Sequence, residues 1–503
     1  MAENTKKRSV LFNSAFNLLG WLVPIIILLV TVPIFNNKLG TDQYGIYLLI
    51  TTIISFVVLL NFGTSESVVK YISEFEFDLR KKNDKVNNII NTSFTLNIIT
   101  SFMILAIIFF LRKYIVDISI SGKFHNKSLY EQSLIYGVIA FCFTMIANTF
   151  LSFFRAIQRF EVSSILGIAQ SIILNVANVI ILYHHGDVRD IMFCTAVISV
   201  IYMIFCLGTV SYFYRGYRPR IRCEKRTFNK LFNFSKYTFL MSIIGMIVFN
   251  ADKLIIGAFL STKEVAYYGI PANLSMKIQQ IIAALVGSLF PKISELFAAN
   301  LFEDIKVMYI KSYKFTVNII VALIIPSFIF SRKLLKYWVG NDVALKATFS
   351  FKVLLIAYAL LALTSVGYFV SYGIDRPSIY TKTYFFMAII NLAFNFTLIP
   401  ILGINGAAIS TLVSNAFVMI MVLKIERILK IKPKVIFKEV YIKAICTGLL
   451  QLGITLCLYL IVKNLIGVFL AGSISFISYY IIYTYIFKFE DEVYKSLVSK
   501  IRP

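Results

Sequence analysis

Long apolar runs dominate this sequence and leave few folds open to it. The 503-residue chain holds fourteen runs of 18 to 26 residues, and a helix of that length crosses the ~30 Å hydrocarbon core of a bilayer. The runs lack the alternation of barrel strands, so the backbone satisfies its hydrogen bonds in lipid as helices. The sequence therefore predicts an all-α polytopic membrane protein. The predicted spans are at about 12–35, 44–62, 89–111, 132–153, 162–183, 190–213, 237–260, 265–290, 309–330, 349–372, 379–402, 404–424, 440–462 and 465–487.

The first twelve runs form two similar halves of six. Four short motifs recur in the same order, at offsets of 216 to 224 residues. Tyr44-Gly45-Ile46 returns as Tyr268-Gly269-Ile270, Ile72-Ser73-Glu74 as Ile293-Ser294-Glu295, Ala156-Ile157-Gln158-Arg159-Phe160 as Gly373-Ile374-Asp375-Arg376-Pro377, and Asn175 with Asn178 as Asn391 with Asn395. Six spans in each copy give both copies the same orientation, as in a parallel repeat. A doubled unit of this kind is typical of a transporter with two pseudo-symmetric lobes around a central cavity.

These signals predict four segments. Residues 1–213 form the first lobe, 214–236 a basic cytoplasmic connector, 237–430 the second lobe, and 431–503 an accessory pair of spans with a cytoplasmic tail. Within the first lobe, the charged stretch 63–88 is expected to be a helical extension on the inner surface.

Basic residues outnumber acidic ones by 50 to 25, and their placement indicates a membrane rather than a nucleic acid. With the N-terminus inside, 35 Lys and Arg fall on the cytoplasmic side and 14 on the outer side, with one more inside a span. This positive-inside bias sets the topology and favours an anionic inner leaflet. We expect both termini to be cytoplasmic and the first apolar run to remain as an uncleaved span. The six cysteines show no disulfide or metal-binding pattern.

Polar residues inside the spans mark the protein interior, because lipid does not tolerate them. Asn13 and Asn17 lie on one face of the first span, and Arg155 and Arg159 on one face at the end of the fourth. They fit two interpretations, helix–helix packing or the wall of a substrate cavity. For the two arginines, which approach the inner boundary, snorkelling is as good an explanation as substrate contact.

The eighth span carries the sharpest signal. Asn273, Lys277 and Gln280 share one face after Pro271, which is expected to interrupt the helix. Lys277 is ~18 Å deep at 1.5 Å per residue, and a central lysine costs ~2.5–3.5 kcal/mol on insertion scales. An acidic partner, water or an anionic ligand must offset that cost.

The seventh span offers three polar residues near this lysine, namely Asn250, Asp252 and Lys253. Asp252 is the natural partner of Lys277 if the pair is structural. If it is not, Lys277 forms a cationic site in the cavity wall. Lys253 lies nearer the outer end, where snorkelling also explains it.

Catalytic chemistry has no visible location in the chain. It contains no phosphate-binding glycine loop followed by Lys-Ser/Thr, no Ser-His-Asp set and no converging carboxylates. His184, His185 and Asp187 form an outer-loop cluster that is better explained as a plain loop than as a metal site. The sequence predicts no enzyme activity, no metal and no cofactor.

Three segments resemble the Wzx-type polysaccharide flippases of the multidrug/oligosaccharidyl-lipid/polysaccharide exporter superfamily. The resemblance covers the whole chain, including the two extra spans, but its motifs are short. They are Lys38-Leu39-Gly40-Thr41 with Tyr44-Gly45-Ile46-Tyr47, Arg155-Ala156-Ile157-Gln158-Arg159-Phe160, and Asn250-Ala251-Asp252-Lys253 with Ile256-Gly257.

The resemblance implies a V-shaped fold and alternating access in a bacterial cytoplasmic membrane. It also implies a substrate, an oligosaccharide on undecaprenyl diphosphate that moves from the inner to the outer leaflet for surface polysaccharide biosynthesis. Lys277, with Lys253, Arg155 and Arg159, would then face the diphosphate, while amide side chains such as Gln280 would hydrogen-bond sugars. Glycan polymerases or other polysaccharide-assembly proteins are the partners it suggests.

Three alternatives remain. Lipid II flippases share this fold, but they carry arginines in the first spans, where this chain has only Asn13 and Asn17. Multidrug exporters carry an acidic cation site in the first lobe, and none of the first six spans here has a central Asp or Glu. A membrane-embedded glycan polymerase usually has a large catalytic outer loop, whereas the longest outer loops here are about twenty residues.

Overall fold

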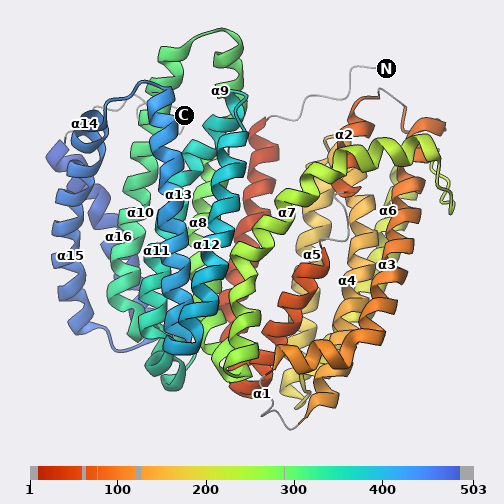
Figure 1. The fold of residues 1–503 in the computed structure, drawn as a ribbon, viewed down its shortest axis with the longest axis horizontal. Coiled ribbons are helices and arrows are strands. Elements are labelled where there is room, and N and C mark those ends of the chain that lie inside the picture. The colour runs from red at the N-terminus through yellow and green to blue at the C-terminus, as the bar shows by residue number, and fades with distance from the viewer. Residues whose placement is uncertain (1–9, 59–63, 76–77, 121–125, 288, 488–503) are drawn as a thin grey trace. The chain divides into compact units, whose positions relative to one another are not determined.

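The computed structural model describes residues 10–58, 64–75, 78–120, 126–287 and 289–487, with only the backbone for 10–22, 226 and 229–241. These residues form helices and connecting turns, and the described part contains no strand (Figure 1). The helices are α1 (Val10–Val57), α2 (Thr64–Ser73), α3 (Asp84–Ser119), α4 (Lys127–Ala156), α5 (Phe160–Tyr183), α6 (Val188–Phe213), α7 (Lys225–Phe259), α8 (Thr262–Val286), α9 (Leu289–Ala298), α10 (Phe302–Trp338), α11 (Asn341–Gly373), α12 (Ser378–Leu402), α13 (Ile404–Ile428), α14 (Pro433–Ile436), the π-helix η2 (Phe437–Ile442), α15 (Lys443–Ile461) and α16 (Leu465–Phe487).

The predicted all-helical membrane architecture is confirmed, with one difference in how the spans are divided. Twelve described helices are long and apolar enough to cross a membrane, or thirteen when the bent pair α8–α9 counts as one span. Helix α1 covers both of the first two predicted runs. Its halves meet at Gly40, whose φ of 77° and ψ of 156° are not helical. Glycine adopts this backbone readily because it has no Cβ, so α1 is two helices joined at a sharp bend.

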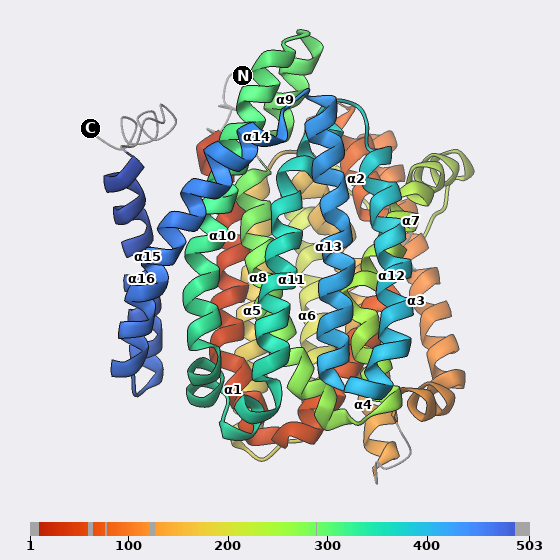
Figure 2. The same ribbon diagram turned by 60° about the vertical axis from the view of Figure 1, so that its left-hand side comes forward.

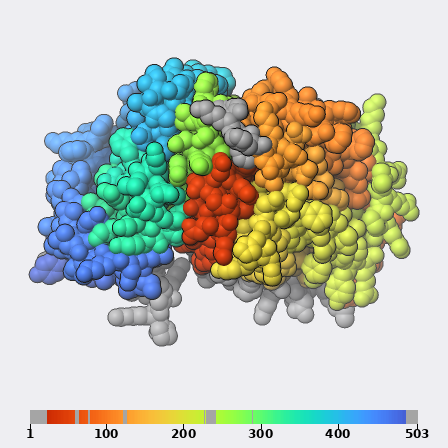
Figure 3. All heavy atoms as spheres, turned by 90° about the horizontal axis from the view of Figure 1, so that it is seen from below, coloured from red at the N-terminus to blue at the C-terminus, as the bar shows by residue number. Residues whose placement is uncertain are grey.

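The chain divides into two compact units, and the division falls inside α8, between Gly269 and Ile270. In unit 1, α4 packs against α3 and α6, α1 against α5, and α7 against α1 and α3. Figure 3 shows the red surface of α1 beside the yellow surface of the α5–α6 region. The centre of this unit is aromatic, with the fully buried rings of Phe150, Phe153 and Tyr214 at the end where α4 and α6 finish.

In unit 2, α11 is the central helix. It packs against α10 and α13, α12 packs against α13, and the hairpin of α15 and α16 lies beside α10 (Figure 2). The helices alternate in direction, so the α11–α12 turn, α14 and the start of α10 lie at the same end of the unit. The predicted division into four segments, with boundaries at residues 214–236 and 430, was drawn from the sequence repeat. It is a different kind of division from the two compact units, and it stays a prediction.

Polar side chains hold the accessory hairpin in place within unit 2. The Gln451 amide donates to the Ala322 carbonyl at 3.0 Å and to the Ser475 hydroxyl at 3.1 Å. The Tyr479 hydroxyl donates to Asn318 at 2.7 Å. In a membrane, apolar contact alone does not select one helix neighbour, since lipid tails are as apolar as leucine. These bonds therefore fix the position of α15 and α16 on α10.

Two local expectations need correction. Helix α8 runs without a break through Pro271, which therefore does not interrupt it, because proline is tolerated in membrane helices when neighbouring groups satisfy the freed carbonyl. The stretch 63–88 is helical only in part. Helix α2 ends at Ser73, and turns follow before Asn83 caps α3 by accepting hydrogen bonds from two backbone N–H groups. The tail 488–503 lies outside the described residues.

Candidate functional site

A buried polar group lies on α7 in unit 1. Asp252 and Lys253 are 3% and 7% exposed. The Asp252 carboxylate accepts hydrogen bonds from the Tyr268 hydroxyl and from the backbone N–H of Lys253, the latter at 2.8 Å. Burying a carboxylate is costly unless it is paired and hydrogen-bonded. The neighbouring lysine and tyrosine supply that compensation, so Asp252 has partners within its own unit.

Glycines bring α1 and the start of α8 into very close contact. A Cβ on Gly45 would lie 1.8 Å from the backbone oxygen of Thr262, and one on Gly269 would lie 2.7 Å from the end of the Leu48 side chain. The Thr262 hydroxyl also donates to the Asp42 carboxylate. Small residues permit such close packing between membrane helices. The repeated Tyr-Gly-Ile motif therefore has a packing role at both of its positions.

Lys277 lies in unit 2, on the part of α8 beyond Pro271. Its ammonium donates to the Gln280 side-chain oxygen at 3.0 Å, and Asn273, Lys277 and Gln280 are all partly exposed. Lys277 and Gln280 thus lie on the same face of the helix, as predicted, and are joined by this hydrogen bond. A carboxamide oxygen is neutral, so this bond stabilises the ammonium without cancelling its charge. Among the described residues of unit 2, no carboxylate forms an ion pair with Lys277.

The remaining residues of the predicted site fall into two groups. Asn250 is partly exposed on α7 and makes a weak contact with the Met246 sulfur at 3.6 Å. Asn13 and Asn17 lie on the first turns of α1, where the side chains are outside the described residues. An Asp252–Lys277 ion pair would join the two units and stays a prediction.

The two predicted arginines lie at the α4–α5 junction. The Arg155 guanidinium donates to the Ser152 hydroxyl at 2.8 Å, and the Arg159 guanidinium lies 4.9 Å from the centre of the Phe213 ring on α6. Gln158 between them has a φ of 59°, which turns the chain sharply from α4 into α5. Both arginines therefore have contacts within unit 1, and both side chains are partly exposed.

The first part of the predicted connector, residues 214–224, lies along α3 without helical structure. We call this segment the strap. Asn91 accepts from the Arg220 N–H at 3.2 Å and donates to the Arg218 carbonyl at 2.8 Å, and Thr95 accepts from the Arg222 N–H at 2.9 Å. The three arginine side chains remain exposed. Burial raises the pKa of the strap's Tyr217, whose hydroxyl donates to Asn91. It therefore stays a donor at neutral pH.

A tyrosine–glutamate cluster at one end of unit 2 was not predicted from the sequence. The Tyr309 hydroxyl donates to the buried Glu426 at 3.4 Å, and the Tyr313 and Tyr441 hydroxyls lie 2.6 Å apart. A cavity of about 460 Å³ beside it is lined by Glu426, Lys434 and Tyr441, among others. The four polar residues come from α10, α13 and η2, and their separation in the sequence hides the cluster.

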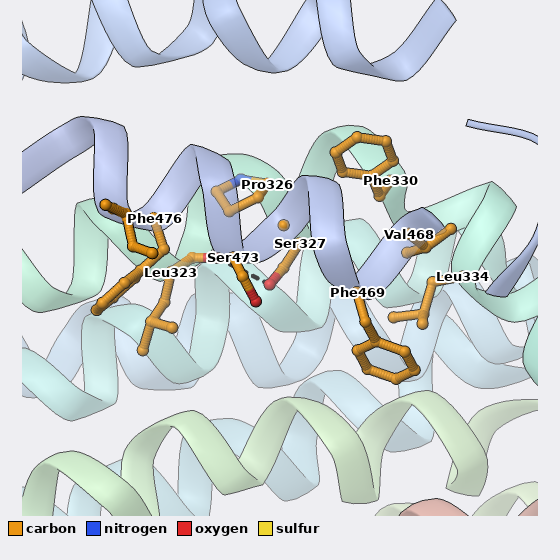
Figure 4. A pocket seen from close by; sticks show the side chains of 11 residues that line it. Leu323, Pro326, Ser327, Phe330, Leu334, Val468, Phe469, Ser473 and Phe476 are labelled. Atoms are coloured by element: carbon orange, nitrogen blue, oxygen red, sulfur yellow. Dashed lines mark hydrogen bonds between the residues drawn. The ribbon is translucent and has the colours of Figure 1, made fainter. Parts of the chain in front are cut away.

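An apolar groove of about 480 Å³ lies between α10 and α16. Figure 4 shows the rings of Phe330, Phe469 and Phe476 around it, with Ser327 and Ser473 as its polar side chains. The Ser327 hydroxyl already donates to the Leu323 carbonyl. This groove has no charged side chain with which to hold a diphosphate.

Three similar proteins carry names that refer to glycan transport or export. A putative O-antigen transporter of Shigella flexneri is 24% identical over 416 residues, which cover 80% of this chain and 94% of that protein. A putative O-antigen export protein of Yersinia pseudotuberculosis is 26% identical, covering 67% and 75%. The probable low-salt glycan biosynthesis flippase Agl15 of Haloferax volcanii is 23% identical, covering 76% of each chain.

Solved structures confirm the predicted fold. The lipid II flippase MurJ in its inward closed conformation superposes with a TM-score of 0.76 at 12% identity, covering 95% of this chain and 99% of that one. An inward-facing multidrug resistance MATE family transporter of the MOP superfamily gives 0.61 at 14% identity, covering 82% and 98%. At these identities the likeness establishes the fold alone.

The family follows from the sequence match. Residues 10–297, more than half of the chain, match the model of the family described as polysaccharide biosynthesis protein. This stretch includes the complete first repeat and the α7–α8 region that carries Asp252, Lys253 and Lys277. The chain therefore belongs to the polysaccharide biosynthesis protein family.

Proposed function

We propose that this multi-pass membrane protein is a flippase that moves an undecaprenyl-diphosphate-linked oligosaccharide across the bacterial cytoplasmic membrane by alternating access. The glycan and the diphosphate cannot cross hydrocarbon unaided, whereas the polyprenyl tail can stay in lipid. The similarity to proteins named putative O-antigen transporter, putative O-antigen export protein and probable glycan biosynthesis flippase supports this class of transport. The protein has no role as an enzyme in this proposal.

Lys277 is the observation that carries the proposal. A lysine deep in a span needs a compensating group, and its partner in unit 2 is the neutral amide of Gln280. A diphosphate that docks at this ammonium would supply the missing negative charge. Lys253, Arg155 and Arg159 are secondary candidates for the same anion, with Asp252 as the group that positions Lys253. Asn13, Asn17, Asn250 and Asn273 are candidates for hydrogen bonds to sugars.

Complementation tests the function directly. Deleting the gene in its host is expected to remove a surface glycan and to leave its lipid-linked precursor inside the cell, and the wild-type chain should restore display. Labelled precursor, followed to the outer surface of spheroplasts, measures the transport itself. Normal display in the deletion strain would contradict the proposal.

A lipid II flippase is the second candidate, since the MurJ fold covers nearly the whole chain. A lipid II flippase would give a different result in the gene-deletion experiment. Loss of a lipid II flippase arrests cell-wall synthesis and causes lysis, whereas loss of a glycan exporter leaves growth intact and removes only the surface polymer.

Topology can be tested at Cys223, which is exposed on the strap. We propose that the strap and both termini are cytoplasmic, with the strap arginines facing the anionic inner leaflet. In a variant that keeps only this cysteine, a membrane-impermeant maleimide should label inside-out vesicles and leave intact spheroplasts unlabelled. Partial desolvation raises the pKa of the Cys223 thiol. The thiolate is the reactive form, so labelling should increase as the pH rises from 7 to 9.

A variant that keeps only Cys446 is the matched control, because that exposed residue lies within the span of α15. It should remain unlabelled from both sides. Labelling of Cys223 in intact spheroplasts would reverse the proposed orientation.

A further inference from the structure

Four tyrosines cluster where α11 turns into α12 in unit 2. The ring centres of Tyr368 and Tyr380 lie 4.4 Å apart, those of Tyr380 and Tyr384 4.0 Å, and those of Tyr368 and Tyr372 4.7 Å. We propose that this tyrosine platform stacks against a sugar ring of the glycan. The inference rests on the proposed flippase function and adds a glycan-binding site to it.

The platform tyrosines of α12 are not on the most exposed side of that helix. Tyr380 and Tyr384 continue the stripe of buried Asn391 and Asn395, which lie 11 and 15 residues beyond Tyr380 on α12. The membrane-facing surface of the same helix is formed by other residues, of which Phe385 and Phe386 are 49% and 53% exposed. Aromatic residues that anchor a helix at the membrane interface would be expected on that other side.

The platform also differs from the core tyrosines of the same unit. Tyr309 and Tyr313 are at most 1% exposed. In the platform, Tyr384 is buried, but Tyr368, Tyr372 and Tyr380 are partly exposed. The platform therefore has a buried side at Tyr384 and a partly exposed side formed by Tyr368, Tyr372 and Tyr380.

This arrangement suits a pyranose ring. The C–H face of a sugar packs on the apolar face of an aromatic ring, while its hydroxyls need hydrogen-bond partners. Tyrosine offers both an apolar ring and a polar hydroxyl. The buried Tyr384 ring, 4.0 Å from the Tyr380 ring, supports the surface from below and keeps it preorganised.

The repeat places a different residue at the corresponding position of the first lobe. The offset of 217 between Ala156 and Gly373 aligns Tyr372 with Arg155. The second copy thus has an aromatic ring where the first has a cation. The tyrosines lie within about two turns of the helix ends at Gly373 and Ser378, at the end of unit 2 that we propose faces the cytoplasm. Newly made lipid-linked glycan arrives on that side.

Paired substitutions distinguish the contribution of the aromatic rings to glycan binding from that of the hydroxyl groups. Tyr368→Leu with Tyr380→Leu removes two rings, Tyr368→Phe with Tyr380→Phe keeps them, and Phe385→Leu with Phe386→Leu is the matched control on the lipid-facing side. Each purified protein is titrated in nanodiscs with undecaprenyl diphosphate and with the lipid-linked glycan fraction extracted from the deletion strain. Surface display is measured in the same strain.

The wild type should bind the glycan-bearing lipid at least tenfold more tightly than undecaprenyl diphosphate. The leucine pair should lose that difference, keep its affinity for the sugar-free lipid, and display at least tenfold less glycan. The phenylalanine pair and the lipid-face control should stay within about threefold of wild type. If the leucine pair does not reach the membrane, the single Tyr372→Leu variant is judged by the same criteria.

Full sugar-dependent binding by the leucine pair would overturn the platform and leave the flippase function intact. Equal losses in the phenylalanine and leucine pairs would also overturn it, because stacking needs only the ring. Failure of the wild type to bind either lipid or to restore display would instead refute the proposed function.

Discussion

Replacing Lys277 with alanine is expected to reduce surface glycan display at least tenfold while leaving the protein folded in the membrane. The variant removes a partly exposed ammonium whose partner in unit 2 is the neutral amide of Gln280. A unit charge pair at 4 Å is worth about 4 kcal/mol at an effective dielectric of 20, so even part of that interaction exceeds a tenfold effect. Display should be quantified in the deletion strain at matched protein abundance in the membrane.

Two variants on α8 control for that result. Lys277→Arg keeps the charge and should retain most of the display, whereas Gln279→Ala changes a neighbouring polar residue off the Asn273–Lys277–Gln280 face and should have no effect. Lys277→Ala should also be at least as thermostable as wild type, because an isolated charge in a span is costly. A stably expressed Lys277→Ala variant with normal display would remove this lysine from the mechanism.

The double variant Lys277→Ala with Asp252→Asn tests the alternative of a structural ion pair. If the two charges serve mainly each other, the second change should rescue display. Asp252 has its own partners in Tyr268 and the backbone of Lys253. We therefore expect no rescue and a further loss.

The sequence predicted the spans because their signal is local and strong. Each apolar run determines its own helix, and the repeat determines how many belong to each copy. The sequence also showed that the two copies differ in where they carry charge. Aligning Gly45 with Gly269 puts Ile53 opposite Lys277, and the structure buries Ile53 as an ordinary apolar residue.

The tyrosine platform and the connector strap were missed because they depend on tertiary contacts. Tyrosines in an apolar run look like any other part of a span, and only the packing of α11 on α12 brings Tyr368 and Tyr380 together. The strap is held by α3 side chains about 130 residues earlier in the chain, as in the bond from Asn91 to Arg218. No local pattern encodes such a pairing. At Pro271 a local rule predicted a break, and α8 instead runs through it.

The close contact of α1 with α8 predicts a graded loss of stability for three glycine-to-alanine substitutions. In Gly45→Ala the new methyl group would meet the backbone of Thr262, which cannot rotate away, whereas in Gly269→Ala it meets the flexible end of Leu48. Gly208 on α6 serves as the control, because a methyl group added there would have nothing within 4 Å. Overpacking costs about 1–3 kcal/mol where the neighbours cannot adjust.

We therefore expect Gly45→Ala to lower the apparent melting temperature in detergent by about 5 °C, at roughly 2 °C per kcal/mol for a large chain. Gly269→Ala should cause a smaller decrease, and Gly208→Ala none, because replacing a helical glycine by alanine favours the helix. Fluorescence-detected size-exclusion after heating gives all three values on one scale. Equal stability of the three variants would mean that the repeated Tyr-Gly-Ile motif does not hold α1 against α8. The order predicted here would show instead that two copies of one motif contribute unequally to stability, since only the first copy meets an immovable backbone.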